Sequence, residues 1–143
     1  MTAGFVPPAN WVEAASSLRT SGQAKLNAAG IATIPFSPDS ANQRWVVSQV
    51  VVSTNQLSVA TTYPFCTMAL NTIDINQMSQ GNQRGTTFSG NSDTYTGAID
   101  VGPCDFLSLL FYPPPGSSGA QIAALSGVLA NAVVLGTKYT RRR

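Results

Sequence analysis

Short apolar runs separated by Gly, Pro, Asn and Asp dominate the chain from about residue 23 to residue 139. The densest run is Phe106–Tyr112, which follows a turn at Gly102–Pro103 and is stopped by three prolines, 113–115. Prolines lack the backbone N–H that a sheet ladder needs, so the triplet marks the end of a strand. Aromatic and branched runs with turn residues between them are typical of consecutive antiparallel strands. Roughly seven to nine such strands predict an all-β fold, a β-sandwich of the jelly-roll kind.

The strongest single strand is predicted over Arg44–Ser53. Strict alternation along it places Trp45, Val47 and Val51 on one face and Val46, Val50 and Val52 on the other. Since both faces are apolar, we expect a central strand, with one face in the core and the other covered by the N-terminal arm or a neighbouring molecule. The predicted core residues are Trp45, Val47, Val51, Leu107, Leu109 and Phe111.

Weaker strand signals fill the rest of this region. Residues 24–36 indicate one strand interrupted at Gly30, as a bulge would do. Residues 120–135 allow two interpretations, because Ile122, Leu125 and Leu129 have helical spacing whereas Gly127 and three nearby valines favour the strand that we expect. The remaining expected strands are Leu57–Thr61, Phe65–Leu70, Thr72–Gln77 and an edge strand over Ala132–Tyr139.

The first 22 residues carry a different pattern. Phe5-Val6-Pro7-Pro8 is held extended by its prolines. Asn10 followed by Glu13 is typical of a capped helix start, and Trp11 and Leu18 have helical spacing, so we expect a helix of about two or three turns ending near Gly22. So short a helix must dock on its own sandwich or on a neighbouring subunit, and we favour the neighbour. The expected contact residues of this arm are Phe5, Pro7, Pro8, Trp11 and Leu18.

Charge sets the C-terminus apart. Arg141, Arg142 and Arg143 form a basic tail, while the rest of the chain contains five basic and six acidic residues. Both a solvated tail and a contact with an acidic partner fit these arginines; without interleaved aromatic side chains, nucleic-acid binding is not expected. The expected organisation is therefore an arm with a short helix over residues 1–22, a sandwich over 23–139 and a basic tail over 140–143.

Charged residues make up only 10% of the 143 residues, against about 25% in an average soluble domain. Uncharged polar surface costs less to desolvate, so this composition suits a protein packed against neighbours, and we expect a homo-oligomer, with a trimer favoured. No apolar run approaches the length of about 18 residues that a membrane span needs. The N-terminus lacks the basic start and apolar stretch of a secretory signal, so export is not expected either.

Signals for catalysis and metal binding are missing. The sequence contains no histidine, which excludes Ser-His-Asp and Cys-His catalysis and histidine metal sites. We interpret Cys66 and Cys104 as reduced core residues, with a cross-strand disulfide as the alternative. Asp93, Asp100 and Asp105 fit turn aspartates that bond their own backbone better than a catalytic pair or a calcium site. We therefore expect no enzyme activity, no cofactor and no metal.

Several short motifs together resemble a known group of proteins. In order they are Arg44-Trp45-Val46-Val47, Tyr63-Pro64-Phe65-Cys66, Thr87-Phe88-Ser89-Gly90-Asn91-Ser92-Asp93, the run from Phe106 to Phe111, and the segment Ala120–Gly127 that follows a Pro-Gly pair. This order resembles the small virion structural proteins of tailed phages that infect actinobacteria, over roughly residues 24–127. In that group a W-x-V strand, a P-x-C strand, a T-x-x-G-N-x-D turn and two hydrophobic strands follow one another. The chain departs from the pattern at Phe111-Tyr112, where a tryptophan is expected, and in its proline triplet.

The resemblance implies a β-sandwich virion protein, either a capsid decoration or minor capsid protein or a minor tail protein. Its partners would be phage capsid or tail proteins, and its location the virion, assembled in the bacterial host cytoplasm. Together with the missing catalytic residues, this predicts a non-enzymatic structural role. The alternative from another class is a carbohydrate-binding module for host-surface attachment, in which exposed tryptophan and tyrosine rings stack on sugars.

Overall fold

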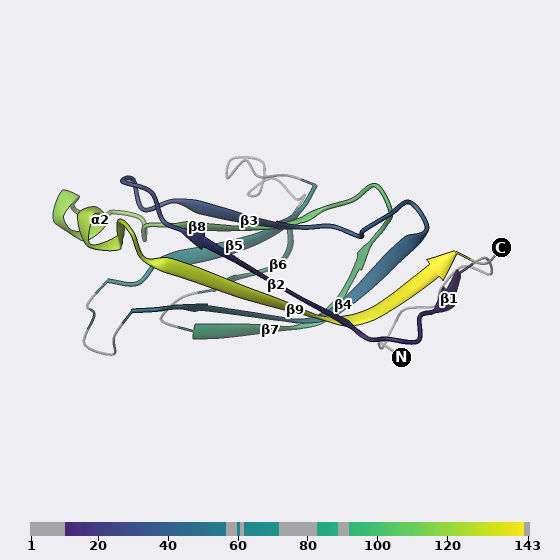
Figure 1. Cartoon of the computed structure of the whole chain (residues 1–143). Coiled ribbons are helices and arrows are strands. Elements are labelled where there is room, and N and C mark those ends of the chain that lie inside the picture. The colour runs from purple at the N-terminus through teal and green to yellow at the C-terminus, as the bar shows by residue number, and fades with distance from the viewer. Residues whose placement is uncertain (1–10, 57–59, 61, 72–82, 89–91, 142–143) are drawn as a thin grey trace.

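The computed structural model describes residues 11–56, 60, 62–71, 83–88 and 92–141 of the chain, with residues 83–88 described as backbone alone. These residues form two antiparallel sheets that lie face to face, with one short helix at one end (Figure 1). The first sheet contains β1 (Trp11–Glu13), β2 (Leu18–Lys25), β4 (Gln43–Thr54), β7 (Ser92–Val101) and β9 (Leu129–Arg141). The second sheet contains β3 (Ala32–Phe36), β5 (Phe65–Leu70), β6 (Gln83–Phe88) and β8 (Leu107–Tyr112). The helix is α2 (Gly119–Leu125).

The order of strands is that of a jelly roll. It runs β2-β9-β4-β7 in the first sheet and β3-β8-β5-β6 in the second, so successive strands repeatedly cross from one sheet to the other. This arrangement of eight strands in two packed sheets confirms the predicted all-β sandwich. β1 is an addition to it, paired with the C-terminal end of β9.

A continuous apolar core fills the space between the sheets. Trp45 and Val47 of β4 are 4% and 0% exposed, and Leu107, Leu109 and Phe111 of β8 are buried on the opposite sheet. The largest buried cluster also includes Ile34, Phe36, Cys66, Met68, Val101 and Val134. The apolar run over β8 thus forms the centre of the second sheet, between β3 and β5.

A bulge in β4 overturns the expected alternation of its side chains. Its register against both neighbours shifts between Val47 and Gln49. Against β9, Ser48 is an extra residue of β4, whereas β7 has two residues opposite Ser48. Beyond Ser48 the faces exchange, which places Val50 and Val52 in the core. The prediction that Val51 is a core residue is therefore wrong; Val51 is half-buried and lies on the outer face of the sheet. The strand itself is central, between β9 and β7.

The expected N-terminal helix is absent among the described residues of the arm, which form β1 and β2 instead. Both strands lie on one edge of β9, with Trp11 opposite Arg141 and Leu18 opposite Gly136. The open edge of β9 offers unpaired backbone groups along its whole length, and these outweigh the weak stability of an isolated helix. The expected boundary between residues 22 and 23 lies inside β2.

Two further strand predictions need correction. The single strand expected over residues 24–36 is two strands, β2 and β3, joined by a turn in which Gly30 has a φ of 75° and donates to the Asn27 carbonyl. The two lie in different sheets, which a bulged single strand would not allow. The expected edge strand over residues 132–139 is instead the middle of β9, a central strand that also includes Thr140 and Arg141 of the expected tail.

The strand expected from Ala120 onward begins as a helix. Ser118 caps α2 by accepting from the Gln121 backbone, while the Gln121 side chain accepts from the Ser118 backbone. Leu125, fully buried, anchors the helix on the core, and Gly127 with a φ of 81° turns the chain into β9. The strands expected at Thr72–Gln77 and, apart from Ala60, at Leu57–Thr61 lie outside the described residues.

Candidate assembly surfaces

A tryptophan cluster lies where the first and last strands meet. Trp11 of β1, only 6% exposed, packs with Val46 and Tyr139 on the outer face of the first sheet. Two guanidinium groups lie over the indole ring, that of Arg44 at 5.8 Å and that of Arg141 at 5.1 Å from its centroid. Such cation–π contacts add a favourable electrostatic interaction to the hydrophobic packing of the ring. Trp11 therefore docks on its own sandwich, as does Leu18, which is 2% exposed in the central core.

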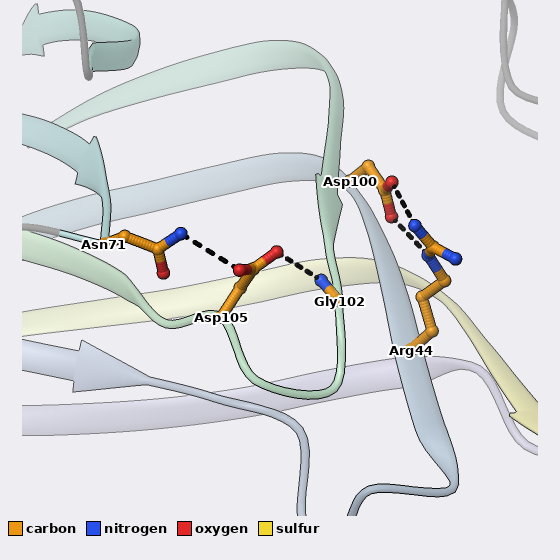
Figure 2. Close-up of polar contacts among 5 residues, drawn as sticks. All are labelled: Arg44, Asn71, Asp100, Gly102 and Asp105. Atoms are coloured by element: carbon orange, nitrogen blue, oxygen red, sulfur yellow. Dashed lines mark hydrogen bonds and ion pairs between the residues drawn. The ribbon is translucent and has the colours of Figure 1, made fainter.

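An ion pair fixes one of these guanidinium groups. Arg44 Nε and Nη2 each donate to a carboxylate oxygen of Asp100 at 2.8 Å (Figure 2). This side-chain hydrogen bond raises the pKa of Arg44. Loss of contact with water, together with the Glu13 carboxylate, raises the pKa of Tyr139 in the same cluster. Among the expected contacts with an acidic partner, Arg141 is thus engaged with Trp11, while Arg142 and Arg143 lie outside the described residues, as do Phe5, Pro7 and Pro8.

The outer face of the first sheet has an apolar middle, with mostly uncharged polar residues around it. Val51 of β4 and Val133 and Leu135 of β9 lie side by side on it, all half-buried, with Val51 directly opposite Val133. Most residues around them on the same face are polar and uncharged, namely Ser21, Gln23, Gln49, Ser53, Thr94, Thr96 and Asn131. Two exposed cationic residues of β2 also lie on this face, Arg19 directly opposite Leu135 and Lys25 at the end of the strand. The side-chain oxygen of Asn131 is buried without a hydrogen-bond partner among the described residues. No helix among the described residues covers this face (Figure 1).

A pocket of about 310 Å³ lies at the end of the sandwich that carries α2. Pro114 and Pro115 of the triplet that was expected to mark the end of a strand form one wall. Tyr63, just before β5, and Phe65, its first residue, form another. Phe65 is held edge-on against Tyr112, with ring centroids 6.1 Å apart, and the Tyr112 hydroxyl is hydrogen-bonded to Thr67 at 2.9 Å. The lining residues are Thr62, Tyr63, Phe65, Pro114, Pro115, Gly116, Ser117 and Gln121. None of them is charged.

The sequence contained signals for this pocket that we did not combine. Tyr63-Pro64-Phe65 was interpreted as part of a strand motif and the proline triplet as the end of a strand, 50 residues apart in the chain. The antiparallel pairing of β5 with β8, which sets Phe65 opposite Tyr112, brings them together. Ser117 then closes the proline turn by donating its hydroxyl to the Pro114 carbonyl at 2.6 Å.

The acidic residues have separate structural roles. Asp105 accepts from the Gly102 backbone and from the Asn71 side chain, both at 2.9 Å, and so ties the β7–β8 turn to the end of β5 (Figure 2). Asp93 accepts from the backbone of Thr94. Asp100 lies in β7 rather than in a turn, and pairs with Arg44. Within the described part of the chain, no group of three His, Cys, Asp or Glu side chains is placed to hold a metal.

The two cysteines lie in different environments. Cys66 is 2% exposed in the core, and its burial raises the pKa of its thiol. Cys104 is exposed in the β7–β8 turn, so its prediction as a core residue is wrong. Both thiols are free. No helix in the part that the structure describes is long and apolar enough to span a membrane.

The chain has structural likenesses to viral proteins at low sequence identity. No protein-family model matches the chain, and no curated protein is significantly similar to it. A chain in the acidic stable capsid structure of Helicobacter pylori bacteriophage KHP30 is similar with a TM-score of 0.49 and 9% identity, over 93% of each chain. Chains from the Gx and Gt strains of infectious bursal disease virus are similar with TM-scores of 0.27 and 0.28, at 16% identity. The matches cover 93% of this chain and 36% and 37% of those chains. Because all three TM-scores are below 0.5, these likenesses support no conclusion about function.

Proposed function

We propose that this chain is a non-enzymatic structural protein of a tailed-phage virion, packed on the particle through the outer face of its first sheet. The observation that carries the proposal is the composition of that face, where Val51, Val133 and Leu135 form an apolar middle inside a polar and mostly uncharged surround, with Arg19 and Lys25 of β2 on its edge. Depletion of charge at the centre of a surface, with a polar rim, is typical of protein interfaces. The jelly-roll topology agrees with this role, since the fold is common in viral capsid domains.

Several finer features belong to the proposal. The sequence motifs resemble virion proteins of phages of actinobacteria, within which a capsid decoration or minor capsid protein and a minor tail protein are the two positions considered. We expect phage capsid or tail proteins and further copies of this chain as partners, with a trimer favoured. Low charge supports this, because only 10% of the residues of the chain are charged and uncharged polar surface is desolvated at smaller cost.

Purified particles provide the test. Quantitative mass spectrometry should find the chain at a fixed copy number per particle, and Val133→Glu and Leu135→Glu should reduce that number severely while the purified proteins stay folded. Ile31→Glu is the matched control, because Ile31 is 39% exposed and lies away from this face, in the turn before β3. Absence of the chain from washed particles would contradict the proposal, as would normal incorporation of both glutamate variants.

One observation favours the alternative, a carbohydrate-binding module. Tyr63 and Phe65 line an uncharged pocket together with Thr62 and Gln121, and aromatic rings beside hydrogen-bonding groups are suited to sugars. Retention of the chain on host cell-wall glycan, lost in Tyr63→Ala but not in Leu135→Glu, would establish this function instead. We rank it second because the pocket occupies one end of the sandwich, whereas the apolar middle of the outer face extends over β4 and β9 of the first sheet.

A further inference from the structure

We propose that the pocket beside α2 receives the N-terminal segment Phe5-Val6-Pro7-Pro8 of a second copy of this chain. This inference rests on the proposed function, since it names one contact by which copies would join in an assembly. Two independent observations carry it. One is the chemistry of the pocket, and the other is the distance along the sandwich between the pocket and the strand that follows this segment.

The pocket suits an extended, proline-bearing peptide. Tyr63, Phe65, Pro114 and Pro115 line it, together with Gly116 and the uncharged polar residues Thr62, Ser117 and Gln121. Grooves lined by aromatic side chains bind such peptides because the proline helix is already ordered, which lowers the entropy lost on binding. Phe65 is preorganised for this, since Tyr112 packs against its ring and Thr67 fixes Tyr112 by a hydrogen bond.

The occupant is argued from the sequence outside the described residues. Of the nine prolines, Pro7 and Pro8 alone precede the sandwich; the other seven are described parts of it. Residues 1–10 contain no charged side chain, which matches the uncharged lining of the pocket. Phe5 adds an aromatic ring next to the proline pair, as an anchor against the aromatic and proline residues that line the pocket.

The N-terminal arm of the same molecule is too short to reach this pocket. Figure 1 shows β1 and α2 at opposite ends of the sandwich. They are separated by β9, whose 13 residues span about 40 Å at roughly 3.3 Å per residue, less a little for its bend. Phe5 lies six residues before Trp11, and a fully extended chain of that length reaches only about 20 Å. The segment can therefore enter such a pocket only on another copy.

The contact has a consequence for symmetry. A segment at one end of the molecule that binds a pocket at the other end joins copies head to tail. Such heterologous contacts close into a ring when the rotation between copies allows it, and otherwise continue as a chain of molecules. Each contact is small, so a closed ring would gain its stability from every arm being engaged at once.

Photo-crosslinking of the full chain tests the proposal. A benzophenone amino acid replaces Phe5, and equal amounts of ¹⁴N-labelled and ¹⁵N-labelled protein are mixed before irradiation. We expect mixed-isotope crosslinks to residues 62–65 or 113–117. Pro7→Ala/Pro8→Ala and Tyr63→Ala should each weaken self-association about tenfold in sedimentation, with Pro35→Ala on β3 as the control that leaves it unchanged. The first of these variants alters no residue of the sandwich, so its result does not depend on folding.

The outcomes separate this inference from the proposed function. Crosslinks confined to one copy, crosslinks outside the pocket, or unchanged association of Pro7→Ala/Pro8→Ala would overturn it, even if the chain is present in particles. Pocket crosslinks between copies would support it even if the chain is absent from particles, which would contradict the proposed function alone. Loss of glycan retention in Tyr63→Ala with unchanged self-association would assign the pocket to a sugar and overturn the inference.

Discussion

A Cβ atom on Gly136 of β9 would overlap the carbonyl oxygen of Val46 on the neighbouring β4. The two strands approach this closely at the Ser48 bulge, where the β4 register shifts between Val47 and Gln49. The Val46 carbonyl belongs to the backbone of β4, which is hydrogen-bonded to both β7 and β9. Moving this carbonyl away would therefore disrupt strand pairing. Glycine is required at this position because of the close approach of two strands.

Gly136→Ala should therefore destabilise the sandwich by about 2–4 kcal/mol, as a substitution that forces backbone apart. Gly119→Ala is the matched control, since nothing lies within 4 Å of its added Cβ and alanine favours the first turn of α2. Urea unfolding monitored by tryptophan fluorescence compares the two free energies of unfolding. Equal stabilities of the two variants would show that β4 and β9 are not in this register.

Because of the bulge, Val47 and Val51 of β4 have different environments, Val47 in the core and Val51 on the outer face. Val47→Ala should cost about 2–3 kcal/mol, because it leaves a cavity in the closed core. Val51→Ala should cost less than about 1 kcal/mol, since that side chain is half-buried on the outer face. The loss of strand propensity is similar in both, so the difference reports burial. If Val51→Ala lowered the free energy of unfolding as much as Val47→Ala does, both side chains would lie in the core and the bulge would be contradicted.

The N-terminal residues should divide into two functional parts. Deletion of residues 1–20 removes β1 with Trp11 and the start of β2 with Leu18, which exposes Val46 and Tyr139 and should lower the stability of the sandwich. Trp11→Ala alone should cost about 3 kcal/mol. Deletion of residues 1–10 keeps both strands and should leave the thermal midpoint close to that of the full chain, while it lowers self-association. A truncation at residue 10 that melts like the deletion of residues 1–20 would contradict this division.

The two thiols should react at very different rates in the native protein. Cys104 is exposed and should react with Ellman's reagent at pH 8, whereas Cys66 is buried and its pKa is raised, so it should react only after unfolding. Cys104→Ser should abolish the native reaction. Two equally fast native thiols would contradict the placement of Cys66 in the core.

The raised pKa of Cys66 also predicts how stability depends on pH. Above the unfolded pKa of about 8.5, the unfolded thiol releases its proton while the buried one keeps it, so the unfolded state binds fewer protons and stability falls as pH rises. Tyr139, whose pKa is also raised, extends the fall above about pH 10. Unfolding free energies measured from pH 7 to 10.5 should decrease, and Cys66→Ala should reduce the slope between pH 8.5 and 10. A wild-type curve that is flat over this range would contradict the burial of both groups.

The local sequence determined the class of fold. The run from Phe106 to Tyr112 becomes β8, and its stop at the proline triplet holds, because proline cannot donate to a ladder and its fixed φ does not depend on distant contacts. Phe65–Leu70 becomes β5 with the predicted bounds. The absence of histidine also limits the possible chemistry in any fold, since it is a property of composition alone.

Tertiary structure decided the features that depend on which partner a segment meets. Residues 11–21 have a pattern that a helix and a strand can both use, and the open edge of β9 selects strand because it satisfies the backbone of β1 and β2. The sequence around Ser48 gives no sign of the bulge. This one residue, extra in the pairing of β4 with β9, exchanges the faces of Val50, Val51 and Val52. The pocket exists only because pairing of β5 with β8 brings Tyr63 and Phe65 beside prolines 50 residues away. Pairing, register and long-range approach are properties of two segments together, and alternation along a single segment does not contain them.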